Sequence, residues 1–86
     1  MIHTTAVVSS RATIGDAVAI GPFTIIHDHV IIGDGTSIGS HCELGHPPMH
    51  ADDQPLIIGR DSLIRSHSVF YAGSVFGERL VTGHRV

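Results

Sequence analysis

Aliphatic residues recur every six positions along most of the chain, and this period restricts the fold more than any other feature. An amphipathic helix would show a spacing near 3.6 residues and hairpin strands would alternate strictly, so neither explains a period of six. The period is interrupted once and then returns with the same spacing. Its members are Ile2, Val8, Ile14, Ile20, Ile26, Ile32, Ile38 and Leu44, then Ile58, Ile64, Phe70 and Phe76.

The fifth position of each hexad carries a small or β-branched residue: Ala6, Ala12, Val18, Thr24, Val30, Thr36, Cys42, Ser62, Ser68 and Ser74. Short strands separated by bends would point the first and fifth positions inward, and three such sides would close a triangular coil of about 18 residues. The second position is often Gly, where we expect the sharp corner. Stacked coils would form three parallel sheets. The sequence therefore predicts an all-β fold, a parallel β-helix.

The composition fits one small domain with an aliphatic core. The chain has 86 residues, of which 42% are hydrophobic and 15% charged, with no Trp. This composition is too apolar for a disordered segment. The chain is also too short for a large self-contained enzyme. We expect residues 1–86 to form a single β-helix domain.

Charge and cysteine usage narrow the class of protein further. The basic residues are five scattered arginines, which give no electrostatic footprint for nucleic acid or an anionic membrane. The N-terminus lacks the basic segment and apolar run of a signal peptide, so we expect a cytoplasmic protein. The single Cys42 excludes an intramolecular disulfide, and its inward position predicts a buried, inert thiol.

The repeat resembles that of the hexapeptide-repeat family, and the resemblance covers nearly the whole chain. It implies a left-handed parallel β-helix and, for most members, a homotrimeric acyltransferase. Residues 55–73 and the run Thr82-Gly83-His84 are similar to acetyltransferases that modify nucleotide-linked sugars. That similarity implies transfer of an acetyl group from acetyl-CoA, as co-substrate, to an amino or hydroxyl group of a nucleotide sugar, with no metal expected. The motifs assign no residue to coenzyme binding.

The interruption of the repeat predicts a protruding loop. Fourteen residues separate Leu44 from Ile58, and residues 46–56, rich in Pro, His and Asp, are typical of a loop. In the family such loops help to build sites at the subunit boundary. A tolerated surface insertion explains the same residues equally well.

Removing the eight extra residues restores the register and predicts which side chains stack. His41, His67 and Arg85 fall in one column, with Phe23 below them. His84 falls in the neighbouring column, above Ser66, Ser40 and Pro22. Both columns lie outside the coil and face solvent or another subunit.

Two of the eight histidines are candidate catalytic residues. Acyl transfer from a thioester needs a base for the attacking amine or hydroxyl and a backbone donor for the oxyanion, and imidazole is suited to the first task at neutral pH. His84 is the first candidate because it follows Gly83 within the acetyltransferase-like run, and His67 is the second. The alternative is that both are polar surface residues.

The other histidines predict no preformed site. His27 and His29 would share a strand face only if the strand ran straight through a corner, so a surface role is favoured over a metal pair. His46 and His50 flank two prolines in the loop.

Two other functions remain open. A hexapeptide-repeat carbonic anhydrase would carry a zinc-ligating His directly after the aliphatic Phe70, where this chain has Tyr71. A noncatalytic solenoid would present a flat face, yet no regular outward Thr or Asp ladder is present. The chain stops at Val86, five residues into a hexad, so we expect it to be the N-terminal part of a longer protein and inactive alone.

Overall fold

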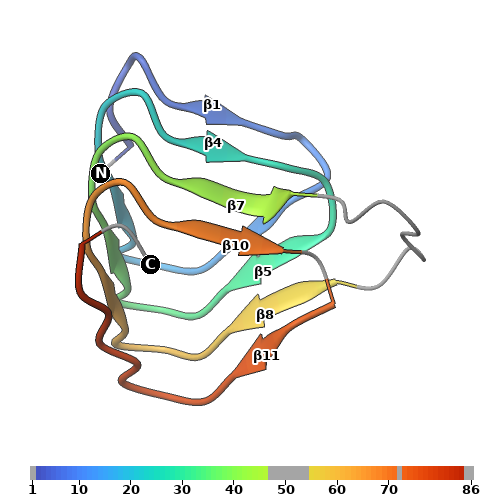
Figure 1. Cartoon of the computed structure of the whole chain (residues 1–86). Coiled ribbons are helices and arrows are strands. Elements are labelled where there is room, and N and C mark those ends of the chain that lie inside the picture. Colours follow the sequence, from blue (N-terminus) through green and yellow to red (C-terminus); the bar gives the residue numbers. More distant parts are fainter. Residues whose placement is uncertain (1, 47–54, 72, 85–86) are drawn as a thin grey trace.

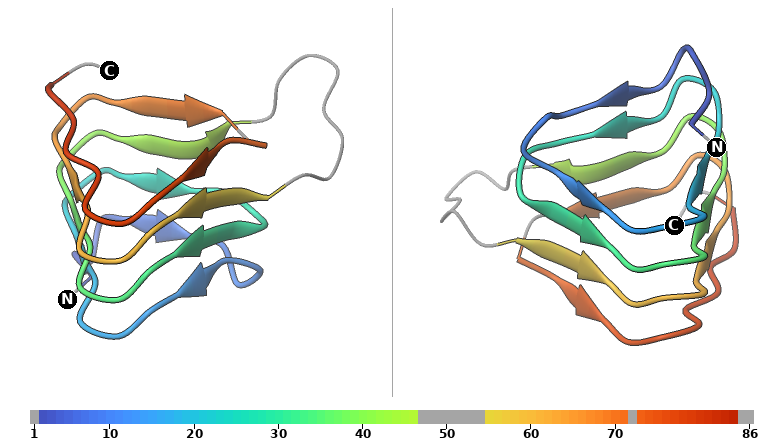
Figure 2. Two further views of the ribbon diagram at one scale, coloured as in Figure 1. Left: turned by 90° about the horizontal axis from the view of Figure 1, so that it is seen from below. Right: turned by 180° about the vertical axis from the view of Figure 1, so that it is seen from behind.

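The computed structural model describes residues 2–46, 55–71 and 73–84 and shows a left-handed parallel β-helix with three sheets. Figures 1 and 2 show the coils stacked one on another, so that strands from successive coils lie side by side. All strand pairs are parallel. The predicted fold class is confirmed.

Each sheet collects the strands from one side of the triangular coil. The first sheet contains β1 (Val7–Val8), β4 (Ile25–Ile26), β7 (Glu43–His46) and β10 (Val69–Tyr71). The second contains β2 (Thr13–Ile14), β5 (Val30–Ile32), β8 (Leu56–Ile58) and β11 (Val75–Phe76). The third contains β3 (Ala19–Ile20), β6 (Ser37–Ile38) and β9 (Leu63–Ile64). Within the part that the structure describes, no helix is long and apolar enough to cross a membrane.

The register agrees with the predicted coil and with the position of the insertion. Thr13 pairs with Ile31 one coil later, and Ile31 pairs with Ile57 across the insertion. His46 is the last residue of β7 and Leu56 the first of β8, so the predicted boundaries of the loop at 46 and 56 extend one residue into each strand. Residues 47–54, including His50, lie outside the described part.

First and fifth hexad positions point into the coil, as predicted. Ile20, Ile32, Ile38, Ile58 and Ile64 are at most 4% exposed, and burial of each contributes roughly 1.5 to 3 kcal/mol. Ile14 is only partly buried, because β2 lies at the edge of its sheet and has a neighbouring coil on one side only. Cys42 is buried, and its thiol contacts the carbonyl oxygen of Arg65 at 3.2 Å.

The sharp corner falls at the fourth hexad position, and the prediction that placed it at the second-position glycines is wrong. Left-handed backbone with φ between 55° and 62° occurs at fourth-position residues, which are Ala17, Phe23, His29, His41, Asp61, His67 and Arg79. Gly35 and Gly73 occupy the same position in other turns. Asp and His tolerate this conformation better than most side chains, which gives three of the histidines a structural reason.

The second-position glycines instead allow the coils to approach each other. A Cβ on Gly33 would lie 2.4 Å from the backbone nitrogen of Arg60, and one on Gly59 would lie 2.5 Å from the carbonyl carbon of Gly77. No side chain fits at such distances, so these positions need Gly for space between backbones rather than for positive φ.

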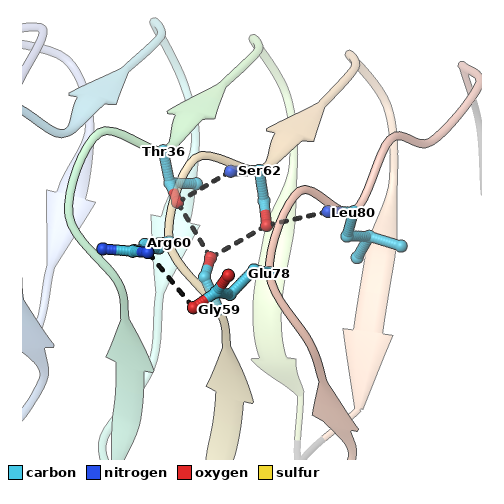
Figure 3. A network of polar contacts seen from close by, with 6 residues as sticks. All are labelled: Thr36, Gly59, Arg60, Ser62, Glu78 and Leu80. Carbon is cyan, nitrogen blue, oxygen red and sulfur yellow. Dashed lines mark hydrogen bonds and ion pairs between the residues drawn. The ribbon is translucent and has the colours of Figure 1, made fainter.

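Buried hydroxyl groups join neighbouring coils at the corners (Figure 3). Ser62 Oγ donates to the carbonyl of Gly59 at 2.8 Å and accepts the N–H of Leu80 at 3.1 Å. Thr36 Oγ1 donates to the same carbonyl at 3.2 Å and accepts the N–H of Ser62 at 3.3 Å. Buried polar residues are therefore tolerated at the fifth position, because their hydroxyls form hydrogen bonds with backbone groups of the corner that a methyl group would leave unpaired.

Candidate functional site

One corner of the coil, where the third sheet turns into the first, gathers the histidines singled out from the sequence. We call His41, His67 and His84, together with Ser66 and Phe23, the histidine corner. It runs along the side of the helix on which the chain enters β7 and β10 (Figure 1). The polar residues lie outside the coil, as the column arithmetic predicted.

Phe23, His41 and His67 form a column of stacked rings. The ring centroids of Phe23 and His41 are 5.2 Å apart, and those of His41 and His67 are 4.9 Å apart with an angle of 2° between the planes. All three side chains are exposed and all three residues have positive φ. Arg85, predicted above them, lies outside the described residues. The position of His67 thus has a structural explanation, in the corner geometry and the stacking.

His84 lies directly above Ser66, in the predicted column. Its Nδ1 is 2.8 Å from Ser66 Oγ, and both groups are exposed enough to meet a ligand. If Nδ1 carries the proton and donates to Ser66, Nε2 is the ring nitrogen that can take up another.

An open groove of about 420 Å³ runs from this corner onto the outer face of the third sheet. This volume lies within the usual range of small-molecule sites. The groove is lined by apolar side chains together with hydroxyl, imidazole and guanidinium groups. It was not predicted from the sequence. Its lining residues are Ser37, Ile38, Gly39, Leu63, Ile64, Arg65, Ser66 and His84.

A second open groove, of about 470 Å³, lies at the last described coil and is mainly apolar. Phe70 and Phe76 meet there with ring centroids 5.1 Å apart, and Leu80 and Thr82 also line it. The groove presents several inward residues of this coil and so continues the hydrophobic core, with Tyr71, Ser74 and Thr82 as its polar members.

His27 and His29, the pair considered as metal ligands, do not come together at one site. His27 Nε2 lies 2.7 Å from Glu43 Oε2, across the strands β4 and β7, while His29 has positive φ at the corner. The pair of His27 and Glu43 was not predicted from the sequence. Its members are 16 residues apart, whereas residues stacked in one column of the coil are 18 apart. Over residues 2–46, 55–71 and 73–84, no three His, Cys, Asp or Glu side chains are grouped to hold a metal ion. Tyr71, at the position of the zinc-ligating His in the alternative hypothesis, is an exposed residue of β10.

Comparison with known proteins agrees with this geometry. Residues 11–46 match the family model described as bacterial transferase hexapeptide (six repeats). The chain is similar to the solved structure of LpxA from Acinetobacter baumannii, with a TM-score of 0.65 and 27% sequence identity. The match covers 96% of this chain and 45% of LpxA, so the chain spans less than half of that relative. No curated protein sequence matches it. In its left-handed β-helix the chain is similar to LpxA, and over residues 11–46 its repeat is similar to that of bacterial hexapeptide transferases.

Proposed function

We propose that the protein is an acyltransferase that moves an acetyl group from acetyl-CoA to an amino or hydroxyl group of a nucleotide-linked sugar. The observation that carries the proposal is the pair of His84 and Ser66 on the rim of an open groove in a hexapeptide-repeat coil. The likeness to LpxA and the match of residues 11–46 to the bacterial transferase repeat support a transferase reaction. Acetyl as the transferred group follows from the similarity of residues 55–73 and of Thr82-Gly83-His84 to sugar acetyltransferases.

His84 acts as the general base in this proposal. Its Nε2 takes the proton from the acceptor amine or hydroxyl as that group attacks the thioester carbonyl, and the new C–N or C–O bond forms while the C–S bond breaks. The proton then passes from His84 to the departing thiolate, which leaves as coenzyme A. His67 is the second candidate base. Its ring stacks on that of His41, whereas His84 lines the groove.

We further propose that the protein works as a cytoplasmic homotrimer. The outer face of the second sheet carries the column Ile31, Ile57 and Val75, of which Val75 is 70% exposed, and Phe23 is 59% exposed at the histidine corner. Apolar columns of this kind on a flat sheet favour burial against symmetric copies.

The test is acyl transfer by the purified full-length protein, with release of the coenzyme A thiol and the mass of the modified sugar as readouts. UDP-linked amino sugars and their hydroxyl counterparts are the acceptors, and acetyl and longer acyl thioesters are the donors. We expect His84→Ala to lower turnover about 100- to 10,000-fold, the usual loss for a general base. His29→Ala, which removes an exposed imidazole at another corner, is the matched control and should keep full turnover.

Other results would redirect or reject the proposal. Full turnover of His84→Ala with loss in His67→Ala would move the base one coil down. Absence of transfer with every donor would favour a noncatalytic solenoid. Bound zinc together with hydration of carbon dioxide would favour the carbonic anhydrase hypothesis.

A further inference from the structure

Arg65 lies between two glycines in one column at the histidine corner. Successive coils place His3, Gly21, Gly39, Arg65 and Gly83 at the same second hexad position. A Cβ on Gly39 would lie 2.8 Å from the backbone nitrogen of Ser66, so the coils meet here through bare backbone. Arg65 is exposed, and its two neighbours in the column, Gly39 and Gly83, have no side chain to cover it.

The backbone of Arg65 is held firmly on both sides of this projection. Its N–H donates to Thr82 Oγ1 at 3.1 Å, and its carbonyl accepts the hydroxyl of Ser68 at 2.9 Å and the thiol of Cys42 at 3.2 Å. These three partners are buried. The buried network fixes where the Arg65 side chain begins, which reduces the entropy lost when a ligand binds it.

The charge of Arg65 is not used within the described part of the chain. Arg11 lies 4.0 Å from Asp28 and Arg60 lies 3.1 Å from Glu78, whereas Arg65 has no carboxylate within ion-pair distance among the described residues. The residues that line the groove include no Asp or Glu. They do include Ser37 and Ser66, whose hydroxyls can donate hydrogen bonds to an anion.

We infer that Arg65 forms an anion-binding subsite for a nucleoside diphosphate, in the same groove as His84. The planar guanidinium donates two parallel hydrogen bonds to phosphate oxygens, and the hydroxyls of Ser37 and Ser66 in the same groove can add further donors. The subsite deepens the proposed function, on which it rests, since it would hold a substrate diphosphate while His84 meets the reacting group. Both a nucleotide sugar and coenzyme A carry a nucleoside diphosphate, and the experiment separates these two sources.

The experiment titrates the purified, ¹⁵N-labelled protein with UDP, with neutral uridine, and with coenzyme A, and follows NMR signals of the Arg Nε–H groups and of the Gly39 and Gly83 amides. UDP should shift the Arg65, Gly39 and Gly83 signals, and uridine should not. Arg65→Gln should weaken UDP binding about 10- to 100-fold, as expected for loss of hydrogen bonds to a charged group. Arg65→Lys, which keeps the charge without the fork, should retain part of the affinity. Higher salt should weaken binding by the native protein.

Arg79→Gln is the matched control, because Arg79 is an exposed arginine at a different corner. It should leave UDP affinity unchanged. If coenzyme A shifts these signals and loses affinity in Arg65→Gln while UDP does neither, the subsite serves the donor and the nucleotide sugar is excluded as its ligand. If Arg65→Gln binds both ligands as tightly as the native protein, the inference is wrong.

The binding readout is independent of turnover, so the two proposals fail separately. Loss of UDP binding in Arg65→Gln without any acyl transfer by the native protein would keep the subsite and reject the acyltransferase. Acyl transfer with an unchanged KM for the nucleotide sugar and for acetyl-CoA in Arg65→Gln would keep the acyltransferase and reject the subsite.

Discussion

Ser66 Oγ and His84 Nδ1 lie 2.8 Å apart although the two residues are separated by 18 positions, one full coil. In the proposed reaction, the hydroxyl oxygen of Ser66 accepts a hydrogen bond from the Nδ1–H of His84, which keeps Nε2 unprotonated and ready to act as the base. Ser66 is thus a positioning residue, which acts through His84.

Ser66→Ala should lower turnover several-fold, with a larger effect on kcat than on KM, because the imidazole loses its fixed tautomer but not its substrate contacts. Ser66→Thr restores the hydroxyl and should restore most of the rate. The ¹⁵N chemical shifts of the His84 ring report the tautomer directly. They should move toward a mixture in Ser66→Ala and return in Ser66→Thr. Unchanged ring shifts in Ser66→Ala would contradict the assignment.

Gly33→Ala should destabilise the fold, because its new Cβ would lie 2.4 Å from the Arg60 nitrogen and the coils would have to separate. Overpacking of this kind costs about 1 to 3 kcal/mol of unfolding free energy. The control is Thr4→Ala, at an exposed position. Thermal unfolding followed by circular dichroism should show a lower Tm for the first variant only. Equal Tm values would mean that coil spacing does not explain the second-position glycines.

Ser62→Ala should also lower stability, because it leaves the Gly59 carbonyl and the Leu80 N–H without the hydroxyl that joins them. Unsatisfied buried groups cost about 1 to 3 kcal/mol. Ser10→Ala, at an exposed position, provides the comparison in urea unfolding. A shared midpoint for the two variants would show that the buried hydroxyl contributes nothing.

Ile20→Asp should prevent folding, because the side chain at this position is 2% exposed and a carboxylate would be buried without a partner. Thr13→Asp places the same group on an exposed strand position and should leave the circular dichroism spectrum unchanged. A folded Ile20→Asp variant would mean that the inner column is not the main source of stability.

Light scattering across a dilution series tests the proposed trimer. We expect a mass of three chains, and Val75→Asp, which charges an exposed apolar column, should shift the protein toward monomers. A monodisperse monomer of the native chain would count against assembly by this surface.

The sequence predicted the fold well because one period controls both burial and pairing. Ile32 and Ile58, for example, pair across the insertion as the hexad arithmetic required. The residue with left-handed backbone at each corner was not predicted, because the preference of this conformation for Asp and His is weak. The frequent Gly at the second position suggested a corner there, but it is explained by the close approach of the coils. The column of Ser66 and His84 was predictable, but their hydrogen bond depends on side-chain rotamers. The role inferred for Arg65 was not predictable from the sequence, because it depends on the residues of neighbouring coils that the fold places beside it.

The insertion between β7 and β8 has a consequence for how the chain can be lengthened. Partners on the second sheet are 18 residues apart at Thr13 and Ile31, and 26 apart at Ile31 and Ile57. Chain-closure entropy rises only with the logarithm of this separation, so the eight additional residues oppose folding by about 0.3 kcal/mol, and eight more would add about 0.2 kcal/mol. This corner can therefore accept foreign segments, such as an epitope or a fluorophore-binding peptide, beside a scaffold whose register stays the same.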